Sequence, residues 1–381
     1  MTNNRRSHGE GSVTARGASK WRIRYDGPST SGGARNQISE TVSGTKSKAL
    51  SVLRKRVRSI ETGDFVGPSQ VTLGQYLKNW LLVHSDNVAP KTIESYTSIV
   101  RSYIEPYLGS VNLQSLEPHH LSALYSSMSE TGLSSATRAH CHRTLRKALS
   151  DATRQNLIIK NPALAITPPR QRRREPETWT TAHFAQFLRL AEGNEFHEFF
   201  EIAALTGMRR GELTGLKWER VDLDRSILRV AETLQRIKGK GLVIGVPKTS
   251  GSRREIALSA RTVELLKAVL RRQLEHQMAA GSVYEVTGYV FTDDIGQPYD
   301  SGRPSKHFLN IARSANLPKQ SLHSLRHLHA SVLLAAGTHI KVVSERLGHS
   351  SVAFTMDVYG HLMPGMQEQA AATIDQALIG K

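Results

Sequence analysis

The chain has 381 residues, 39% of them hydrophobic, which leaves room for two or three domains with real cores and excludes wholesale disorder. Lys and Arg number 51 against 33 Asp and Glu, a formal net charge of +18, and this excess predicts a polyanionic partner. A solvated basic surface and attraction to an anionic membrane are the alternatives.

The sequence lacks the usual signals of a membrane or secreted protein. It holds no run of about 18 apolar residues, and its N-terminus has no apolar core of a secretory signal. The single cysteine, Cys141, excludes an intrachain disulfide and a cysteine-based zinc site. Leu145 and Leu149 follow it at helical spacing, so the thiol is expected in a core. These features predict a cytoplasmic protein that acts on nucleic acid.

Residues 1–66 predict a small α+β module. In its first strand Arg22 and Arg24 alternate with apolar residues, which gives the strand a cationic face, and a second short strand and a helix follow. Residues 1–70 carry 13 Lys and Arg against 5 Asp and Glu, a net charge of +8. A module this small has little core to stabilise, so the charge indicates DNA binding, with an exposed basic face as the alternative.

Residues 71–165 predict a helical domain. Apolar residues recur at helical spacing in four stretches, the last of them from about Ser135 to Ile158. Basic residues are dense on the polar sides of this fourth helix, which favours phosphate contacts over a merely solvated surface. Arg138 and Arg146 are the residues expected to make these contacts.

Residues 166–178 predict a basic linker, because three prolines break structure there and four arginines cluster. Arg172 and Arg173 are expected to lie along a DNA backbone, and a simple tether is the alternative.

Residues 179–381 predict the largest domain. Helical patterns lie at about 181–192, 197–205, 209–217 and 260–278, and again from 303 to the end. Strand patterns lie at 227–233, 242–246 and 254–258. The expected fold class is therefore multidomain and mainly α, with a small α+β N-terminal module, a helical domain, and a mostly helical C-terminal domain that carries a small inserted antiparallel β-sheet.

The chemistry to look for on DNA is phosphodiester cleavage. It needs a nucleophile, an acid for the leaving oxygen and cations for the equatorial charge. The sequence has no Walker loop, no carboxylate cluster and no HExxH motif. Guanidinium groups are then the natural clamp, since their planar fork matches phosphate oxygens.

One candidate guanidinium lies in the segment TGMRRGEL. An apolar helix ends at Gly207 and a new helix starts at once, so Arg209 is expected at a helix N-terminus, where backbone N–H groups also favour phosphate. Glu212 follows three residues later and can orient the guanidinium. The alternative is an ordinary capped helix with a surface arginine.

The second candidate guanidinium, that of Arg326, has several histidines close to it in the sequence. His323 and Arg326 share one helix face and can reach one anion. His327 and His329 follow closely, so zinc binding is an alternative, but no acidic or cysteine partner lies near them in the sequence. His349, in the triplet Leu-Gly-His, is a further candidate residue of the catalytic site.

Tyr359 and Lys248 complete the set. Tyr359 lies ten residues after His349 and would alone be assigned to packing. Lys248 lies between two predicted strands, at an expected hairpin tip from which it could reach into a groove and donate a proton. Taken alone it would be a solvated turn residue.

Together these groups strongly resemble the tyrosine recombinase (phage integrase) family. The segments TGMRRGEL, HSLRHLHASVLLAAG and LGHSSVAFTMDVYGHL match its catalytic boxes, and the candidates follow in the order Arg209, Lys248, His323, Arg326, His349, Tyr359. Residues 71–165 look like its helical core-binding (SAM-like) domain and residues 179–381 like its catalytic domain. Residues 1–66 resemble, more loosely, the arm-type DNA-binding module of larger integrases.

The resemblance implies the role of each group. Tyr359 would attack the scissile phosphate and form a 3′-phosphotyrosyl link, while Arg209 and Arg326 clamp the nonbridging oxygens. His323 would assist proton transfer and phosphate binding, and His349 would contact the phosphate. Lys248 would protonate the leaving 5′-oxygen, and Glu212 would support the site. Because the bond energy is kept in the covalent intermediate, the family needs no metal, ATP or other cofactor.

The resemblance also implies partners. Double-stranded attachment sites and a homotetramer on DNA are expected, together with an accessory DNA-bending protein or an excisionase, and no membrane. A C-terminal helix near 366–378 would dock on a neighbouring subunit. Two rival functions remain open: DNA relaxation of the type IB topoisomerase kind, which uses similar groups, and DNA-binding regulation by a degenerate catalytic domain. The separate basic N-terminal module favours recombination over the first, and the intact set of catalytic candidates argues against the second.

Overall fold

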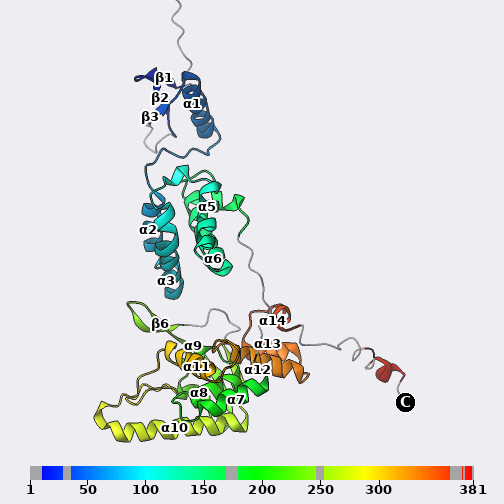
Figure 1. The fold of residues 1–381 in the computed structure, drawn as a ribbon. Helices are drawn as coiled ribbons and strands as arrows, with labels where there is room; N and C mark the ends of the chain where they lie inside the picture. Colours follow the sequence, from blue (N-terminus) through cyan, green and yellow to red (C-terminus); the bar gives the residue numbers. More distant parts are fainter. Residues whose placement is uncertain are drawn as a thin grey trace, which may run out of the picture. The chain divides into compact units, whose positions relative to one another are not determined.

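The computed structural model describes residues 11–28, 36–168, 179–245, 253–360, 371 and 374–379. The chain separates into two compact units, Met1–Arg174 and Glu175–Lys381 (Figure 1). Three candidate site residues, Lys248, Arg172 and Arg173, lie outside the described residues, as does most of the predicted linker. Among the described residues, no helix is both long enough and apolar enough to cross a membrane.

The first unit begins with a three-stranded antiparallel sheet and one helix. These elements are β1 Ser12–Ala15, β2 Lys20–Asp26, β3 Gln37–Ser43 and α1 Lys46–Glu61, with the strands in the order β1-β2-β3. Alternation along β2 buries Ile23 and Tyr25, which pack against Leu53 of α1, while Arg24 stays exposed. The expected α+β module is confirmed.

The rest of the first unit is helical. Its helices are α2 Leu73–His84, α3 Pro90–Ile99, α4 Glu105–Leu108, α5 Pro118–Glu130 and α6 Ser135–Arg154. A π-helical turn, Val100–Ile104, joins α3 to α4, and 3₁₀ turns lie at Leu113–Ser115 and Pro162–Ala165. The fourth predicted helix is α6, but it ends before Ile158, because Asn156 adopts a left-handed φ of 54°. Cys141 is fully buried in this core, as expected.

The second unit is mostly helical. Its helices are α7 Thr181–Ala191, α8 His197–Thr206, α9 Arg210–Thr214, α10 Ala260–Ala280, α11 Gly302–Ser314, α12 Ser324–Ala335, α13 Ile340–Leu347 and α14 Val352–Tyr359, with 3₁₀ turns at Trp218–Arg220 and Gly281–Val283. Its strands are β4 Val221–Asp222, β5 Ile227–Val230, β6 Thr233–Ile237, β7 Gly241–Gly245 and β8 Arg254–Ala257. Within the predicted C-terminal helix, residues 374–378 are helical.

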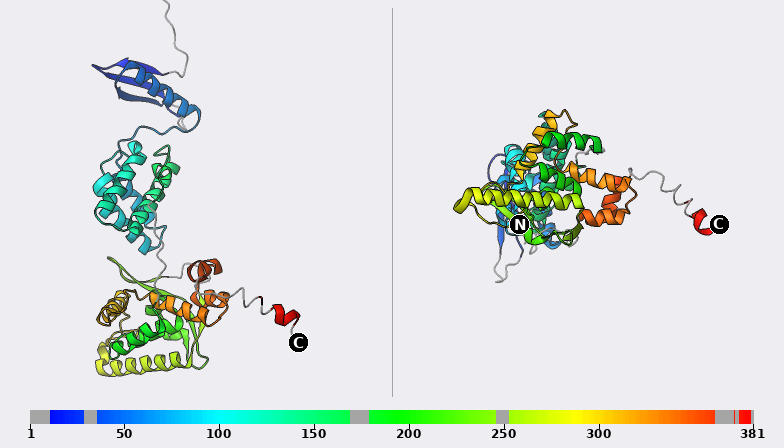
Figure 2. Two further views of the ribbon diagram at one scale, coloured as in Figure 1. Left: turned by 45° about the vertical axis from the view of Figure 1, so that its right-hand side comes forward. Right: turned by 90° about the horizontal axis from the view of Figure 1, so that it is seen from below.

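The strands form two small antiparallel sheets. One has the order β4-β5-β8 and the other is the hairpin β6-β7, which extends from the helices of the unit (Figure 2). The single strand predicted at 227–233 is therefore wrong in detail, since β5 pairs with β8 whereas β6 pairs with β7. Lys248, expected at a hairpin tip, lies outside the described residues, and the described strands before and after it, β7 and β8, belong to different sheets.

The helix predicted at 209–217 is also shorter than expected. It ends at Thr214, and the chain then becomes extended, where the Val290 N–H donates to the Leu216 carbonyl and Lys217 forms an antiparallel bridge with Tyr289. Tertiary pairing with a distant segment thus overrides the local helical pattern.

Two hydrophobic cores hold the second unit together. The larger contains a cluster of aromatic rings from α7, α8 and α11, and Trp179, which precedes α7, contacts both Phe187 and Phe308. The smaller lies among α12, α13 and α14, which lie side by side (Figure 1), and includes the buried ring of Tyr359. The mainly helical, multidomain fold class is confirmed.

Candidate active site

Arg209 lies where two helices meet. Helix α8 ends at Gly207, whose φ of 65° reverses the chain, and Arg209 then caps the N-terminus of α9. Glu212 closes this turn: its Oε2 accepts the backbone N–H of Arg209 at 2.9 Å, and its Oε1 accepts from Nη1 of the same residue at 2.8 Å. The spacing of three residues therefore fixes both the backbone and the guanidinium of Arg209.

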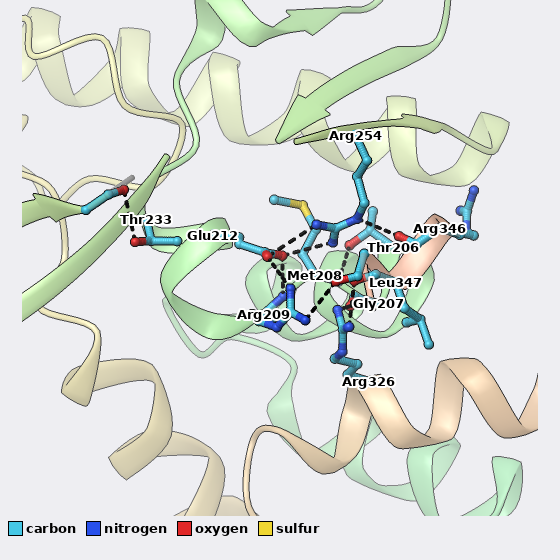
Figure 3. A network of polar contacts seen from close by, with 12 residues as sticks. Thr206, Gly207, Met208, Arg209, Glu212, Thr233, Arg254, Arg326, Arg346 and Leu347 are labelled. Carbon is cyan, nitrogen blue, oxygen red and sulfur yellow. Dashed lines mark hydrogen bonds and ion pairs between the residues drawn. The ribbon is translucent and has the colours of Figure 1, made fainter. Parts of the chain in front are cut away.

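Arg254 approaches the same carboxylate from β8. Its Nη2 donates to Oε2 of Glu212 at 2.9 Å and its Nη1 to Oε1 at 3.2 Å, while its Nε donates to the Arg346 carbonyl at 2.6 Å (Figure 3). Burial alone would raise the pKa of Glu212, but the hydrogen bonds and charges of Arg254 and Arg209 lower it. Glu212 is therefore an ionised carboxylate inside the protein.

Arg326 is the most enclosed cation of the site, with 2% of its surface exposed. Its Nη1 donates to the Gly207 carbonyl at 2.7 Å and its Nη2 to the Leu347 carbonyl at 2.6 Å. Arg209 donates from Nη2 to the next carbonyl, that of Gly348, at 3.0 Å. Burial and the nearby Arg209 lower the pKa of Arg326 to about 9, so an anion beside it would relieve unfavourable positive charge.

Two candidate histidines border these cations. His323 caps the N-terminus of α12, and His349 follows the left-handed Gly348 at the end of α13. The Nδ1 atom of His349 lies 2.8 Å from Oγ1 of Thr355. Burial, followed by the positive charges around them, lowers the pKa of His323 to about 4 and that of His349 to about 3. Both rings are neutral at neutral pH and able to donate one N–H to an anion.

Tyr359 ends α14 and is buried, with 2% of its surface exposed. Its hydroxyl lies 2.6 Å from Nδ1 of His327, on the neighbouring α12. Burial raises the pKa of the phenol to about 12, although the charge of Arg326 acts in the opposite direction. The phenol therefore carries its proton at neutral pH and needs a group that can remove it before it can act as a nucleophile.

The structure thus brings six of the predicted residues into one region: Arg209, Glu212, His323, Arg326, His349 and Tyr359. The predicted DNA-contacting residues of the first unit differ in exposure, since Arg24 and Arg146 are exposed whereas Arg22 and Arg138 are partly buried.

Sequence reasoning missed the roles of Arg254 and His327 in this region. The sequence indicates His327 and His329 only as possible zinc ligands. In the structure His327 contacts Tyr359, and His329 lies between the Ala204 carbonyl and Nε of Arg346. The only feature of the local sequence that points to His327 as a site residue is its position next to Arg326. The local sequence around Arg254 does not mark it as a site residue, because its partners Glu212 and Arg346 are distant in the chain.

Comparison with known proteins shows which family the chain resembles. The model of the phage integrase family matches residues 187–365, and that of the phage integrase N-terminal SAM-like domain matches residues 72–129. A tyrosine recombinase XerC-like protein of Caldanaerobacter subterraneus subsp. tengcongensis is 28% identical, with 88% of this chain and 90% of the relative covered. The ICEBs1 integrase of Bacillus subtilis is 26% identical, with 88% and 92% covered.

Solved structures share the fold. The Tn1549 transposon integrase in complex with a circular intermediate DNA has a TM-score of 0.69 at 24% identity, covering 81% of this chain and 99% of that one. A lambda integrase tetramer bound to a Holliday junction has a TM-score of 0.58 at 18% identity, covering 93% and 96%. The chain belongs to the phage integrase family and is a tyrosine-type site-specific recombinase.

Proposed function

We propose that this recombinase integrates or excises a mobile DNA element by cutting and rejoining strands through Tyr359, with a 3′-phosphotyrosyl link as the intermediate. The observation that carries the proposal is the pairing of the two guanidinium groups. Arg326 and Arg209 donate to consecutive carbonyls, those of Leu347 and Gly348, ahead of the helix that bears Tyr359. One short backbone stretch thus positions both cations and leads into the nucleophile.

The two guanidinium groups form the phosphate clamp. Each has five N–H donors, and the contacts described above use two from each, so donors remain for phosphate oxygens. Because protein contacts already fix both groups, little reorganisation is needed when charge develops on the phosphate. His323 and His349 add neutral N–H donors at the same anion, and Glu212 holds Arg209 in place.

Lys248 is the proposed acid. As the phenol oxygen of Tyr359 bonds to phosphorus and the bond to the 5′-oxygen breaks, the ammonium of Lys248 gives that oxygen its proton. Rejoining reverses these transfers with a 5′-hydroxyl as the nucleophile. In the described part of the chain, strand β7 precedes this residue and strand β8 follows it.

The remaining assignments concern the whole assembly. We assign residues 1–66 to arm-type DNA binding, residues 71–165 to core-site binding, residues 166–178 to a basic linker and residues 179–381 to catalysis. The net charge of +18 supports double-stranded DNA as the partner. A homotetramer on DNA, an accessory DNA-bending protein or excisionase, and action in the cytoplasm complete the proposal.

The test is covalent trapping with Tyr359→Phe. The substrate is a nicked suicide duplex that carries the attachment sequence from the DNA beside the gene. The parent is expected to leave a covalent band on a denaturing gel, and the variant to bind the duplex nearly as tightly without forming the band. Tyr289→Phe, which alters another buried tyrosine, is the matched control and should keep the band. A covalent band that persists in Tyr359→Phe would overturn the proposal.

The same material separates the rival functions. A type IB topoisomerase would relax a supercoiled plasmid that carries no attachment site, whereas the recombinase is expected to need paired sites. A DNA-binding regulator would bind the duplex without a covalent band even in the parent.

A further inference from the structure

The contact between His327 and Tyr359 is specific in its geometry. Nδ1 of His327 lies 2.6 Å from the phenol oxygen, and the two rings are 5.6 Å apart between centroids. Both residues lie on regular helices, α12 and α14, that pack on each other in the smaller core. The hydrogen bond is therefore held by the fold and not by a chance rotamer of a surface side chain.

The direction of this hydrogen bond follows from the chemistry of the phenol. A buried hydroxyl needs an acceptor for its proton. If Nδ1 carried the ring hydrogen, it would face the phenol oxygen as a donor and leave the phenol hydrogen without its described partner. With Nδ1 unprotonated and Nε2 bearing the hydrogen, the phenol donates to His327. Burial, and then the charge of Arg326, lower the pKa of His327, so the neutral ring is the form present at neutral pH.

We infer that His327 is a catalytic residue, which positions the phenol of Tyr359 and accepts its proton during strand cleavage. The inference rests on the proposed function of Tyr359. The phenol proton passes to Nδ1 of His327, the phenol oxygen bonds to phosphorus, and the bond from phosphorus to the 5′-oxygen breaks. The leaving oxygen takes its proton from Lys248. On rejoining, the imidazolium of His327 returns the proton to the phenol oxygen as that oxygen leaves phosphorus.

His323 is the competing candidate for this role. Its ring lies 5.1 Å from that of His327 between centroids, in an edge-to-face arrangement, and its described neighbours are the cations of the clamp. The charged and titratable groups around His327 are Arg326 and His323 on its own helix, His349 ahead of α14, and Tyr359 itself. Of the histidines among them, His327 alone has a described hydrogen bond to the phenol.

The test separates removal of the phenol proton from protonation of the leaving group. His327→Gln can still accept a hydrogen bond but cannot take a proton. Single-turnover cleavage of the suicide duplex by this variant should fall by about 10²–10⁴-fold, the usual range for general base catalysis. A duplex with a 5′-bridging sulfur releases a thiolate, which needs little protonation. This duplex should rescue Lys248→Ala but should not rescue His327→Gln.

The pH profile on the sulfur duplex is the sharper readout. The cleavage rate of the parent should not change with pH near neutrality. It should fall in acid, where His327 becomes protonated, and this fall should occur at a pH below the ordinary histidine range. In His327→Gln the rate should instead rise by about tenfold per pH unit, because the reaction then depends on the fraction of free phenolate. His276→Gln on α10 alters a histidine outside the site and should reproduce the parent rate and profile.

Three outcomes decide the matter. A His327→Gln rate within about threefold of the parent, with a level profile, overturns the role of His327 while leaving Tyr359 as nucleophile. A covalent band in Tyr359→Phe overturns the proposed function instead. If His327→Gln does not fold, ¹⁵N chemical shifts of the histidines in the parent decide: Nδ1 of His327 is expected to be unprotonated and to shift in Tyr359→Phe, and a protonated Nδ1 would refute the inference.

Discussion

Glu212 and Arg254 form a bidentate ion pair inside the recombinase, with Nη2 2.9 Å from Oε2 and Nη1 3.2 Å from Oε1. Both side chains are buried, with 6% of Arg254 and 1% of Glu212 exposed. Arg209 donates to the same two oxygens from its backbone and from its guanidinium. One carboxylate thus pairs with two arginines of the site and leaves a net positive charge, and it fixes the position of Arg209, one of the two guanidinium groups of the proposed clamp.

Glu212→Gln should therefore destabilise the protein strongly. Removing one partner of a buried ion pair costs about 3–5 kcal/mol, because the remaining charge is left uncompensated. Urea unfolding of the full chain measures the loss. Glu219→Gln is the matched control: it removes an exposed partner of Arg220, and the free energy of unfolding should change by less than about 1 kcal/mol. Equal effects of the two substitutions would contradict the structural role of Glu212.

Gly207→Ala should be more harmful than an ordinary glycine substitution. Gly207 has a φ of 65°, and an added Cβ would lie 2.6 Å from Cδ2 of His329 and 2.9 Å from a methyl group of Leu347. Gly193→Ala is the control, since its φ is 77° but nothing lies within 4 Å of the new methyl group. The backbone strain, about 1–2 kcal/mol, is common to both. Overpacking should add about 1–3 kcal/mol at Gly207 alone, and equal losses in urea unfolding would refute the clash.

The second unit should lose stability in mild acid, partly through His329. Its Nδ1 lies 2.8 Å from the Ala204 carbonyl, and its Nε2 accepts from Nε of Arg346, so the ring is neutral. Burial, with Arg346 next, lowers its pKa to about 4. Since the unfolded chain binds the proton first, the stability from this ring is complete above pH about 6.5 and is lost as pH falls toward 4.

The slope of unfolding free energy against pH tests this role. Between pH 5 and 6, unfolding of the parent takes up to one proton more than unfolding of His329→Gln. The slope of the unfolding free energy against pH should therefore be lower in His329→Gln by up to about 1.4 kcal/mol per pH unit. Stability should be measured by urea unfolding in matched buffers. An unchanged slope in His329→Gln would mean that this histidine already takes up its proton in the folded state.

Arg24→Ala should weaken DNA binding through one lost phosphate contact. The side chain is exposed on β2, opposite the buried Ile23 and Tyr25. The logarithm of affinity for long attachment DNA, plotted against the logarithm of salt concentration, should lose about 0.9 from its slope, while cleavage of a minimal core site should survive. Arg271→Ala, an exposed arginine on α10, is the control. A parent-like slope for Arg24→Ala would argue against an arm function for this strand.

Much of the fold was predictable because local patterns decide it. Alternation along β2 and apolar spacing along α6 determine which faces are buried, whatever the later contacts are. The errors arose where distant segments decide. The chain after Thr214 pairs with Tyr289 and Val290, and the segment from Ile227 divides its strand pairing between β8 and β7. Neither partner could be inferred from the local sequence.

By itself, the sequence determined the chemical groups of the candidate site, because motif spacing places Arg209 beside Glu212 and His323 beside Arg326 on single turns of helix. Only the tertiary structure decided how these turns meet. The carbonyls of Leu347 and Gly348 position both guanidinium groups, and the packing of α12 on α14 gives Tyr359 a hydrogen bond to His327 rather than to His323. The physical reason is that a short motif fixes a residue within one turn, whereas the partner of a buried phenol depends on which helix packs against its own.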